Sequence, residues 1–194
     1  YHAWTYDLAG KLLGTTDKVG FAGLDLGAHG LVRLPAAEKH GMLFVRPKPV
    51  QPGESLEIDV DGNLGEIAPD LTALKLETYP LFSVDRIAPR INWKFAIDTF
   101  LEGYHIPHLH RKTIGPYFIG NVGTFDSAGL HGRMCVARTS IDAVRGLPEA
   151  ERNYRPHVIS IYQLFPNTIL IWQVDHIEIW RAFPSRDDPS RCDV

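Results

Sequence analysis

Apolar residues recur at three- and four-residue spacing between Asn92 and Tyr104, and this spacing predicts an amphipathic helix. Asn92 is suited to cap the start of this helix, because its side chain can accept a hydrogen bond from a free backbone N–H. Pro107 is expected to stop the helix soon after Tyr104. The apolar stripe consists of Trp93, Ala96, Ile97, Phe100, Leu101 and Tyr104.

The last third of the chain is rich in β-branched and aromatic residues, which favour strands. Pro166-Asn167 and Asp175-His176 are turn candidates between the strands. A weaker alternation over 76–87 predicts another strand, whereas the Gly-rich stretch 115–130 is expected to be a loop over a pocket. The predicted strands are Met134–Thr139, His157–Phe165, Thr168–Val174 and Ile177–Phe183. One long helix packed against an antiparallel meander is an α+β fold.

The first fifty residues have a different character, because short apolar runs alternate with glycines. This pattern predicts a small β-rich unit with tight turns. Pro47, Pro49, Pro52 and Gly53 then predict a linker, since proline removes backbone donors and stiffens the chain. We therefore expect one domain over 1–50 and a second over 51–194.

Composition narrows the class of protein. The 194 residues are 44% hydrophobic and 22% charged, which is enough to form a core and excludes a disordered chain. A net charge of −3 argues against nucleic acid or an anionic membrane as a partner. No apolar run reaches the roughly 18 residues of a membrane helix. The two cysteines, Cys135 and Cys192, are far apart, so we expect a cytoplasmic protein without disulfides.

Candidate chemistry is concentrated just after the predicted helix. Three histidines, His105, His108 and His110, lie within six residues, and Glu102 is one helical turn before the first. Two imidazoles and a carboxylate are the ligands of a mononuclear non-haem iron(II) site. The same groups could hold zinc, although the spacing of the zinc-protease motif is absent.

Two motifs in this order resemble a known family. The start, Tyr1-His2-Ala3-Trp4-Thr5-Tyr6, is similar to the second half of the Rieske iron–sulfur motif C-P-Y-H-x-W-x-Y. Residues 92–110 resemble the signature N-W-K-x3-E-N-F-x2-D/E-x-Y-H-x4-H. That signature is typical of the α subunit of Rieske non-haem iron oxygenases, the ring-hydroxylating oxygenases.

The resemblance implies a role for each matching residue. His2 matches a ligand of the 2Fe-2S cluster, and His105 and His110 match the two histidine ligands of the catalytic iron. Glu102 matches the acid that bridges the Rieske centre of one subunit to the iron of its neighbour. His108 matches no ligand, so we interpret it as an outer or surface residue.

Three differences from the family pattern matter. Asp98 and Thr99 replace the usual Glu and Asn, which changes the surroundings of the iron but removes no ligand. The remaining cluster ligands are absent. The third iron ligand, an Asp, is expected beyond Val194, because Asp175, Asp187, Asp188 and Asp193 are poorly placed for it.

The resemblance implies the C-terminal part of a β-rich Rieske domain followed by a helix-grip (START/SRPBCC-like) catalytic domain. The complete enzyme would use O2 and electrons from NAD(P)H, delivered by a reductase and in some cases a ferredoxin, to hydroxylate an aromatic or other hydrophobic molecule. Its cofactors would be a 2Fe-2S cluster and iron(II), and its assembly a homotrimer or α3β3. We expect this piece to be inactive alone.

Two alternatives stay open. One is a Rieske monooxygenase or demethylase that acts on a non-aromatic substrate such as a quaternary amine. Such a pocket would need aromatic and acidic groups around the cation. The other is a metal-free helix-grip binding domain. In each case, we expect a pocket between helix and meander lined by apolar residues. The expected lining is Phe100, Leu109, Phe118, Ile161, Leu170 and Trp172.

Overall fold

The computed structural model describes residues 2–194, and the chain divides into two units, residues 1–60 and 61–194. Short antiparallel hairpins make up the regular structure of the first unit, together with one 3-10 turn. Its elements are β1 (Thr5–Tyr6), β2 (Leu12–Gly14), η1 (Leu26–His29), β3 (Ala36–Lys39) and β4 (Met42–Val45). Strand β1 pairs with β2, and β3 with β4. The assignment of 1–50 to a Rieske domain and of 51–194 to a catalytic domain stays a prediction.

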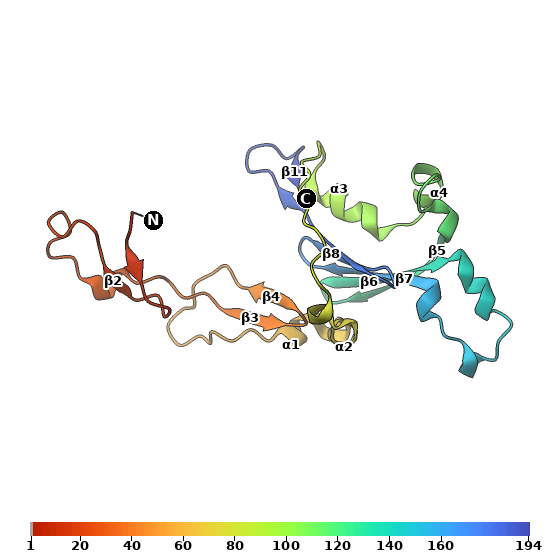
Figure 1. The fold of residues 1–194 in the computed structure, drawn as a ribbon, viewed down its shortest axis with the longest axis horizontal. Helices are drawn as coiled ribbons and strands as arrows, with labels where there is room; N and C mark the ends of the chain where they lie inside the picture. The colour runs from red at the N-terminus through yellow and green to blue at the C-terminus, as the bar shows by residue number, and fades with distance from the viewer. Residues whose placement is uncertain (1) are drawn as a thin grey trace. The chain divides into compact units, whose positions relative to one another are not determined.

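The second unit is built on a five-stranded antiparallel sheet of strand order β5-β6-β7-β8-β9, in which each strand pairs with its neighbour along the chain (Figure 1). The strands are β5 (Phe118–Ala128), β6 (His131–Arg138), β7 (Val158–Leu164), β8 (Thr168–Trp172) and β9 (Ile177–Arg181). The antiparallel α+β class expected from the sequence is therefore confirmed, and so are the four strands of its last third.

Helices lie over both faces of this sheet (Figure 1). The helical segments from residue 60 to the start of the sheet are α1 (Val60–Leu64), η2 (Gly65–Ile67), α2 (Ala68–Leu74), η3 (Leu76–Thr78), α3 (Trp93–Asp98), η4 (Thr99–Leu101), α4 (Ile106–Leu109) and η5 (Gly115–Tyr117). Because side chains alternate along a strand, each face can bury its own set of apolar residues.

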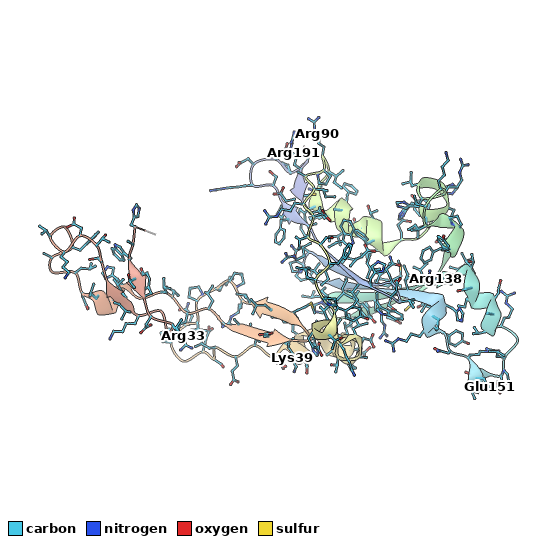
Figure 2. The ribbon with its side chains drawn as sticks, in the orientation of Figure 1. Arg33, Lys39, Arg90, Arg138, Glu151 and Arg191 are labelled. Atoms are coloured by element: carbon cyan, nitrogen blue, oxygen red, sulfur yellow. The ribbon has the colours of Figure 1, made fainter. Side chains whose placement is uncertain are left out.

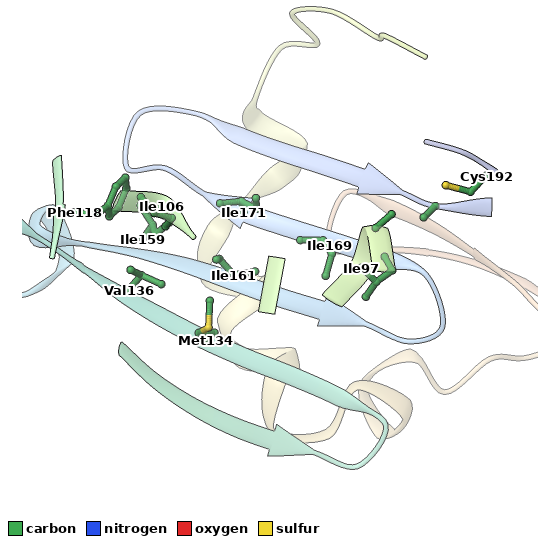
Figure 3. Packing of buried hydrophobic residues seen from close by; sticks show 12 residues of the cluster. Ile97, Ile106, Phe118, Met134, Val136, Ile159, Ile161, Ile169, Ile171 and Cys192 are labelled. Carbon is green, nitrogen blue, oxygen red and sulfur yellow. The ribbon is translucent and has the colours of Figure 1, made fainter. Parts of the chain in front are cut away.

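One face of the sheet packs under α3, η4 and α4. Ile97 of α3 and Ile106 of α4 belong to the same buried cluster as residues from three central strands (Figure 3). The strand members are Met134, Val136, Ile159, Ile161, Ile169 and Ile171. This cluster fixes the segment between α3 and α4 against the sheet.

The opposite face packs under α1 and α2. His131 is buried, and its Nε2 lies 3.1 Å from the carbonyl oxygen of Asn63 in α1. Arg133 donates a hydrogen bond of 2.6 Å to Asp70 of α2. Burial, and then the charge of Asp70, raises the pKa of Tyr162 to about 12, so its phenol stays neutral. The buried apolar residues of α1–α2 and of this face include Leu64, Ile67, Leu71, Leu74, Leu170 and Trp172.

The loop expected over 115–130 is instead the long edge strand β5. Its glycines allow close strand pairing. A Cβ on Gly123 would lie 2.5 Å from the carbonyl oxygen of Cys135 on β6, so only glycine fits there. The register shifts between Phe118 and Gly123, which indicates a bulge at this point. The glycines that predicted a loop therefore lie in the sheet and allow its strands to pair closely.

The strand expected over 76–87 is also wrong. The chain there forms the 3-10 turn η3 and then an extended segment outside the sheet. Phe82 is fully exposed, which shows that this segment has no neighbouring face against which its apolar side chains could pack. Pairing is confined to the end of the segment, where Ile87 and Val194 exchange two backbone hydrogen bonds of 2.9 Å.

The long helix expected over 92–104 is shorter than its apolar stripe. Helix α3 ends at Asp98 and tightens into η4, and Glu102 is already extended, with φ −140° and ψ 156°. The Thr99 hydroxyl donates to the carbonyl oxygen of Phe95 at 2.8 Å, an i−4 contact that competes with the helical pattern. Gly103 then disfavours a further turn. Pro107 does not stop this helix but lies in the first turn of α4.

The remaining elements connect or extend the sheet. Residues 139–157 join β6 to β7, and Glu151 lies at the tip of this segment (Figure 2). These elements are η6 (Thr139–Val144), η7 (Glu149–Glu151), η8 (Arg155–His157), β10 (Phe183–Pro184) and β11 (Cys192–Asp193). None of the helices within residues 2–194 has the length and apolar character to cross a membrane.

Asn92 is confirmed as the cap of α3 and carries a first prediction. Its Oδ1 accepts from Lys94 N at 3.0 Å, and its Nδ2 donates to Pro189 O at 2.8 Å. We expect Asn92→Ala to lower the free energy of unfolding by about 1–2 kcal/mol, because the cap and the second bond are both lost. Urea unfolding measures this loss. Asn92→Asp keeps the cap and should lose less, whereas an alanine variant as stable as the parent would contradict the assignment.

Candidate functional site

The predicted metal ligands lie on the short segment that links η4 to α4. Glu102 follows η4 in an extended conformation, His105 is the N-cap residue of α4, and His110 is its C-cap residue. A single turn of helix, Ile106–Leu109, separates the two histidines and returns the chain on itself. The two imidazoles lie close together, as the sequence predicts, but Pro107 is inside this helical turn and does not mark the point where the preceding helix ends.

Backbone contacts fix the position of His110. Its N–H donates to Ile106 O at 3.1 Å, and its own carbonyl oxygen accepts from Gly115 N at 2.9 Å. A Cβ on Gly115 would lie 2.9 Å from that same oxygen, so the approach requires glycine. The loop after α4 is thereby held close against the residue that carries the imidazole.

The imidazole rings of His105 and His110 lie with their centroids 5.3 Å apart and their planes at 66°. Glu102 binds His105 twice. Its Oε2 accepts from the backbone N–H of His105 at 3.2 Å, and its Oε1 contacts the ring Nδ1. The side chains of His105 and Glu102 are 16% and 33% exposed, so both are half-buried but still reachable.

This geometry suits two ligands of one metal ion. An imidazole nitrogen binds a divalent metal at about 2.0–2.1 Å, so two rings that share an ion have centroids about 4.5–5 Å apart. The observed 5.3 Å is close to that separation. A carboxylate on Nδ1 fixes the tautomer that leaves Nε2 free for a metal, as outer carboxylates commonly do. The site therefore fits two histidine ligands with Glu102 behind the first.

The third ligand is not found among residues 2–194, where no group of three or more His, Cys, Asp or Glu could hold a metal ion. The expectation that the third ligand is an Asp beyond Val194 stays a prediction. Asp188 is bonded to Ser190 at 2.9 Å and 2.6 Å, and Asp175 to His176 at 2.8 Å. Neither of these acids is presented to His105 and His110.

The other residues of the two motifs are placed as follows. His108 is exposed in α4, and Asp98 and Thr99 are exposed at the end of α3. His2 lies in the first unit, where its carbonyl oxygen accepts from the Thr16 hydroxyl at 3.2 Å. Tyr1 of the Rieske-like motif lies outside the described residues. The roles of Glu102, His2, His105 and His110 stay predictions.

The expected pocket lining is partly wrong. Phe118 and Ile161 belong to the cluster under α3 and α4, and Phe100 packs against it. Leu170 and Trp172 are on the opposite face, because they alternate with Ile169 and Ile171 along β8. Leu109 is 79% exposed and packs against neither face.

Sequence reasoning missed a polar group on β9. Glu178 accepts from Trp180 Nε1 at 2.9 Å and from Gln173 Nε2 at 3.1 Å. His176 Nε2 lies 3.4 Å from the same carboxylate. The alternation of Glu178 and Trp180 places them on one face of a strand, but only the strand pairing shows which face.

Asp175 and His176, which lie beside Glu178, shift each other's pKa. The hydrogen bond with Asp175 raises the pKa of His176 above its ordinary value, and Glu178 adds to this effect. The same bond to His176 lowers the pKa of Asp175. His176 is therefore protonated over a wider pH range than a free imidazole.

Comparisons with known proteins show which family and which solved structures this chain resembles. A family model described as "Ring hydroxylating alpha subunit (catalytic domain)" matches residues 76–194. The oxygenase subunit of a glycine betaine monooxygenase from Chromohalobacter salexigens is 31% identical over 114 residues, which are 59% of this chain and 24% of that protein.

Solved structures show the same fold. A quaternary ammonium Rieske monooxygenase studied for carnitine oxidation by gut microbiota and inter-subunit electron transfer has a TM-score of 0.70 at 16% identity. The match covers all of this chain and 50% of that one. The enzyme CntA in complex with L-carnitine has a TM-score of 0.68 at 16% identity, over 100% and 48% of the two chains. The chain thus spans about half the length of these structures.

Proposed function

Since the chain belongs to the ring hydroxylating alpha subunit family, whose catalytic-domain model matches residues 76–194, we propose that it forms part of a Rieske-type monooxygenase acting on a quaternary amine. The observation that carries this proposal is the pair of imidazoles 5.3 Å apart with Glu102 behind one of them. The relatives named as acting on glycine betaine and carnitine support this alternative better than hydroxylation of an aromatic ring.

Residues of this chain have defined tasks in the proposed reaction. His105 and His110 would hold iron(II) through one nitrogen each. Bound iron supplies the activation of dioxygen. Glu102 accepts the hydrogen bond from His105 Nδ1–H, which keeps the ring oriented so that Nε2 is the nitrogen that would bind the metal. Ile106, which follows His105, is anchored in the buried cluster beneath α3 and α4.

The Rieske cluster does not fit the residues present. Such a centre is held by two cysteines and two histidines. Residues 1–60 contain His2 but no cysteine, so this chain offers one matching ligand. A helix-grip architecture for the catalytic domain and a homotrimer or α3β3 assembly remain parts of the proposal, as does a reductase that delivers electrons from NAD(P)H.

The overall reaction gives a direct test. One atom of O2 enters a C–H bond of the amine, and the other leaves as water with two protons and the two electrons of NAD(P)H. The complete enzyme with its reductase is supplied with 18O2 and either a quaternary amine or an aromatic hydrocarbon. We expect product from the amine with one labelled atom. Two labelled atoms in an aromatic diol would instead establish dioxygenation, and no product with iron absent would favour a binding domain.

A further inference from the structure

The carboxylate of Glu178 has nitrogen atoms of three side chains around it. The indole N–H of Trp180 donates to Oε2 at 2.9 Å, and the amide of Gln173 donates to Oε1 at 3.1 Å. His176 approaches Oε1 at 3.4 Å. The side chain still has 33% of its surface exposed. A carboxylate that is held in place and accessible therefore lies on β9.

The strand register places this carboxylate on the same face as the proposed site. Glu178 pairs directly with Ile171, and Trp180 pairs with Ile169. Both isoleucines belong to the cluster that contains Ile97 and Ile106. Because Glu102 and His105 lie between those two residues in the chain, Glu178 and Trp180 face the layer that carries the predicted iron ligands.

Aromatic rings accompany the carboxylate. The ring of Phe100 lies 5.3 Å from that of Trp180, with a 41° angle between their planes. The indole N–H is engaged by Glu178, so the edge of Trp180 is fixed. Aromatic faces attract cations through the negative potential over the ring, and tryptophan does so most strongly. Phe100 is two residues before Glu102, which connects this aromatic pair to the site.

We propose that Glu178, Trp180 and Phe100 recognise the positively charged headgroup of the substrate. A quaternary ammonium group carries no N–H and needs charge and aromatic surface rather than a directed acceptor. Glu178 provides these features, because its carboxylate oxygens already accept hydrogen bonds and it lies beside two aromatic rings. The inference deepens the proposed function and rests on it, because it assumes a cationic substrate.

The charge of the ligand can be tested apart from its shape. Choline and 3,3-dimethylbutan-1-ol have nearly the same shape, but carbon replaces the charged nitrogen in the second. Their equilibrium binding to the complete enzyme is measured by calorimetry without reductant, so no turnover is needed. We expect the parent enzyme to bind choline at least about tenfold more tightly than the neutral compound.

Variants of Glu178 and Trp180 test the charge and the aromatic ring separately. Glu178→Gln removes the charge at constant size and should reduce the preference for choline about tenfold, with little effect on the neutral compound. Trp180→Leu should also reduce it, whereas Trp180→Phe should retain most of it. Glu151→Gln is the matched control, because Glu151 is an exposed acid at the tip of the 139–157 segment (Figure 2).

An unchanged preference in a folded Glu178→Gln variant would overturn this inference and leave the proposed function standing. The absence of any preference in the parent would overturn the cationic substrate class itself. If Glu178→Gln fails to fold, the two Trp180 variants decide, since equal preference in Trp180→Leu and the parent would contradict the aromatic part.

Discussion

Glu102→Gln in the complete enzyme is expected to reduce turnover about 100-fold and to leave both metals bound, at the upper end of the effects of outer carboxylate partners. In the structure, Glu102 accepts from the backbone N–H of His105 and contacts its Nδ1. Glutamine keeps the size and one acceptor oxygen but loses the charge. It therefore still orients the ring, but it supplies no negative charge beside Nδ1.

Steady-state turnover is measured beside the iron and labile sulfide content of the same sample. Glu151→Gln, a substitution of an exposed acid, should have parental values in both measurements. Turnover equal to the parent would show that the charge of Glu102 has no role in the reaction. Loss of mononuclear iron would show that Glu102 is needed to hold the metal, which differs from the role proposed here.

The second large effect concerns the metal itself. His105→Ala and His110→Ala should each lose most of the mononuclear iron, because either change removes one nitrogen from a site that has few ligands. The fall in affinity should exceed the roughly 100-fold loss typical of an outer partner. Iron is measured per protein chain after dialysis, and the Rieske cluster is followed separately by its visible absorbance.

His108→Ala is the matched control for these two variants. It changes an exposed histidine of the same short helix α4, next to both proposed ligands in the chain. We expect it to retain iron. Thermal unfolding of all three variants shows whether they keep the fold. Full iron content in His105→Ala and His110→Ala, with the fold intact, would exclude the assignment of these residues as ligands.

Local patterns predicted part of the fold well. Each of the four β-branched segments in the last third is a strand, and Asn92 caps α3 as its position suggested. These features depend on neighbours in the chain. The predictions were wrong where the local structure depends on a segment that is distant in the sequence. The glycine at 123 lies in a strand because β6 approaches it closely, and 76–87 stays outside the sheet.

The candidate site lies on one short segment of the chain. Glu102, His105 and His110 are within nine residues, so their short separation in the sequence is enough to place them close together. Glu178 is far along the chain from this segment. Its place on the same face follows from its pairing with Ile171, which a single sequence does not encode as a local pattern.

The sequence by itself determined the α+β class, the four strands of the last third and the cap of α3, and it predicts the Glu102–His105–His110 set, because capping and residue spacing act over a few residues. Only the tertiary structure decided that Leu170 and Trp172 belong to the opposite face and that β5 is a strand. Strand register and the layering of helices depend on contacts between distant segments, and these contacts also bring Trp180 against Phe100.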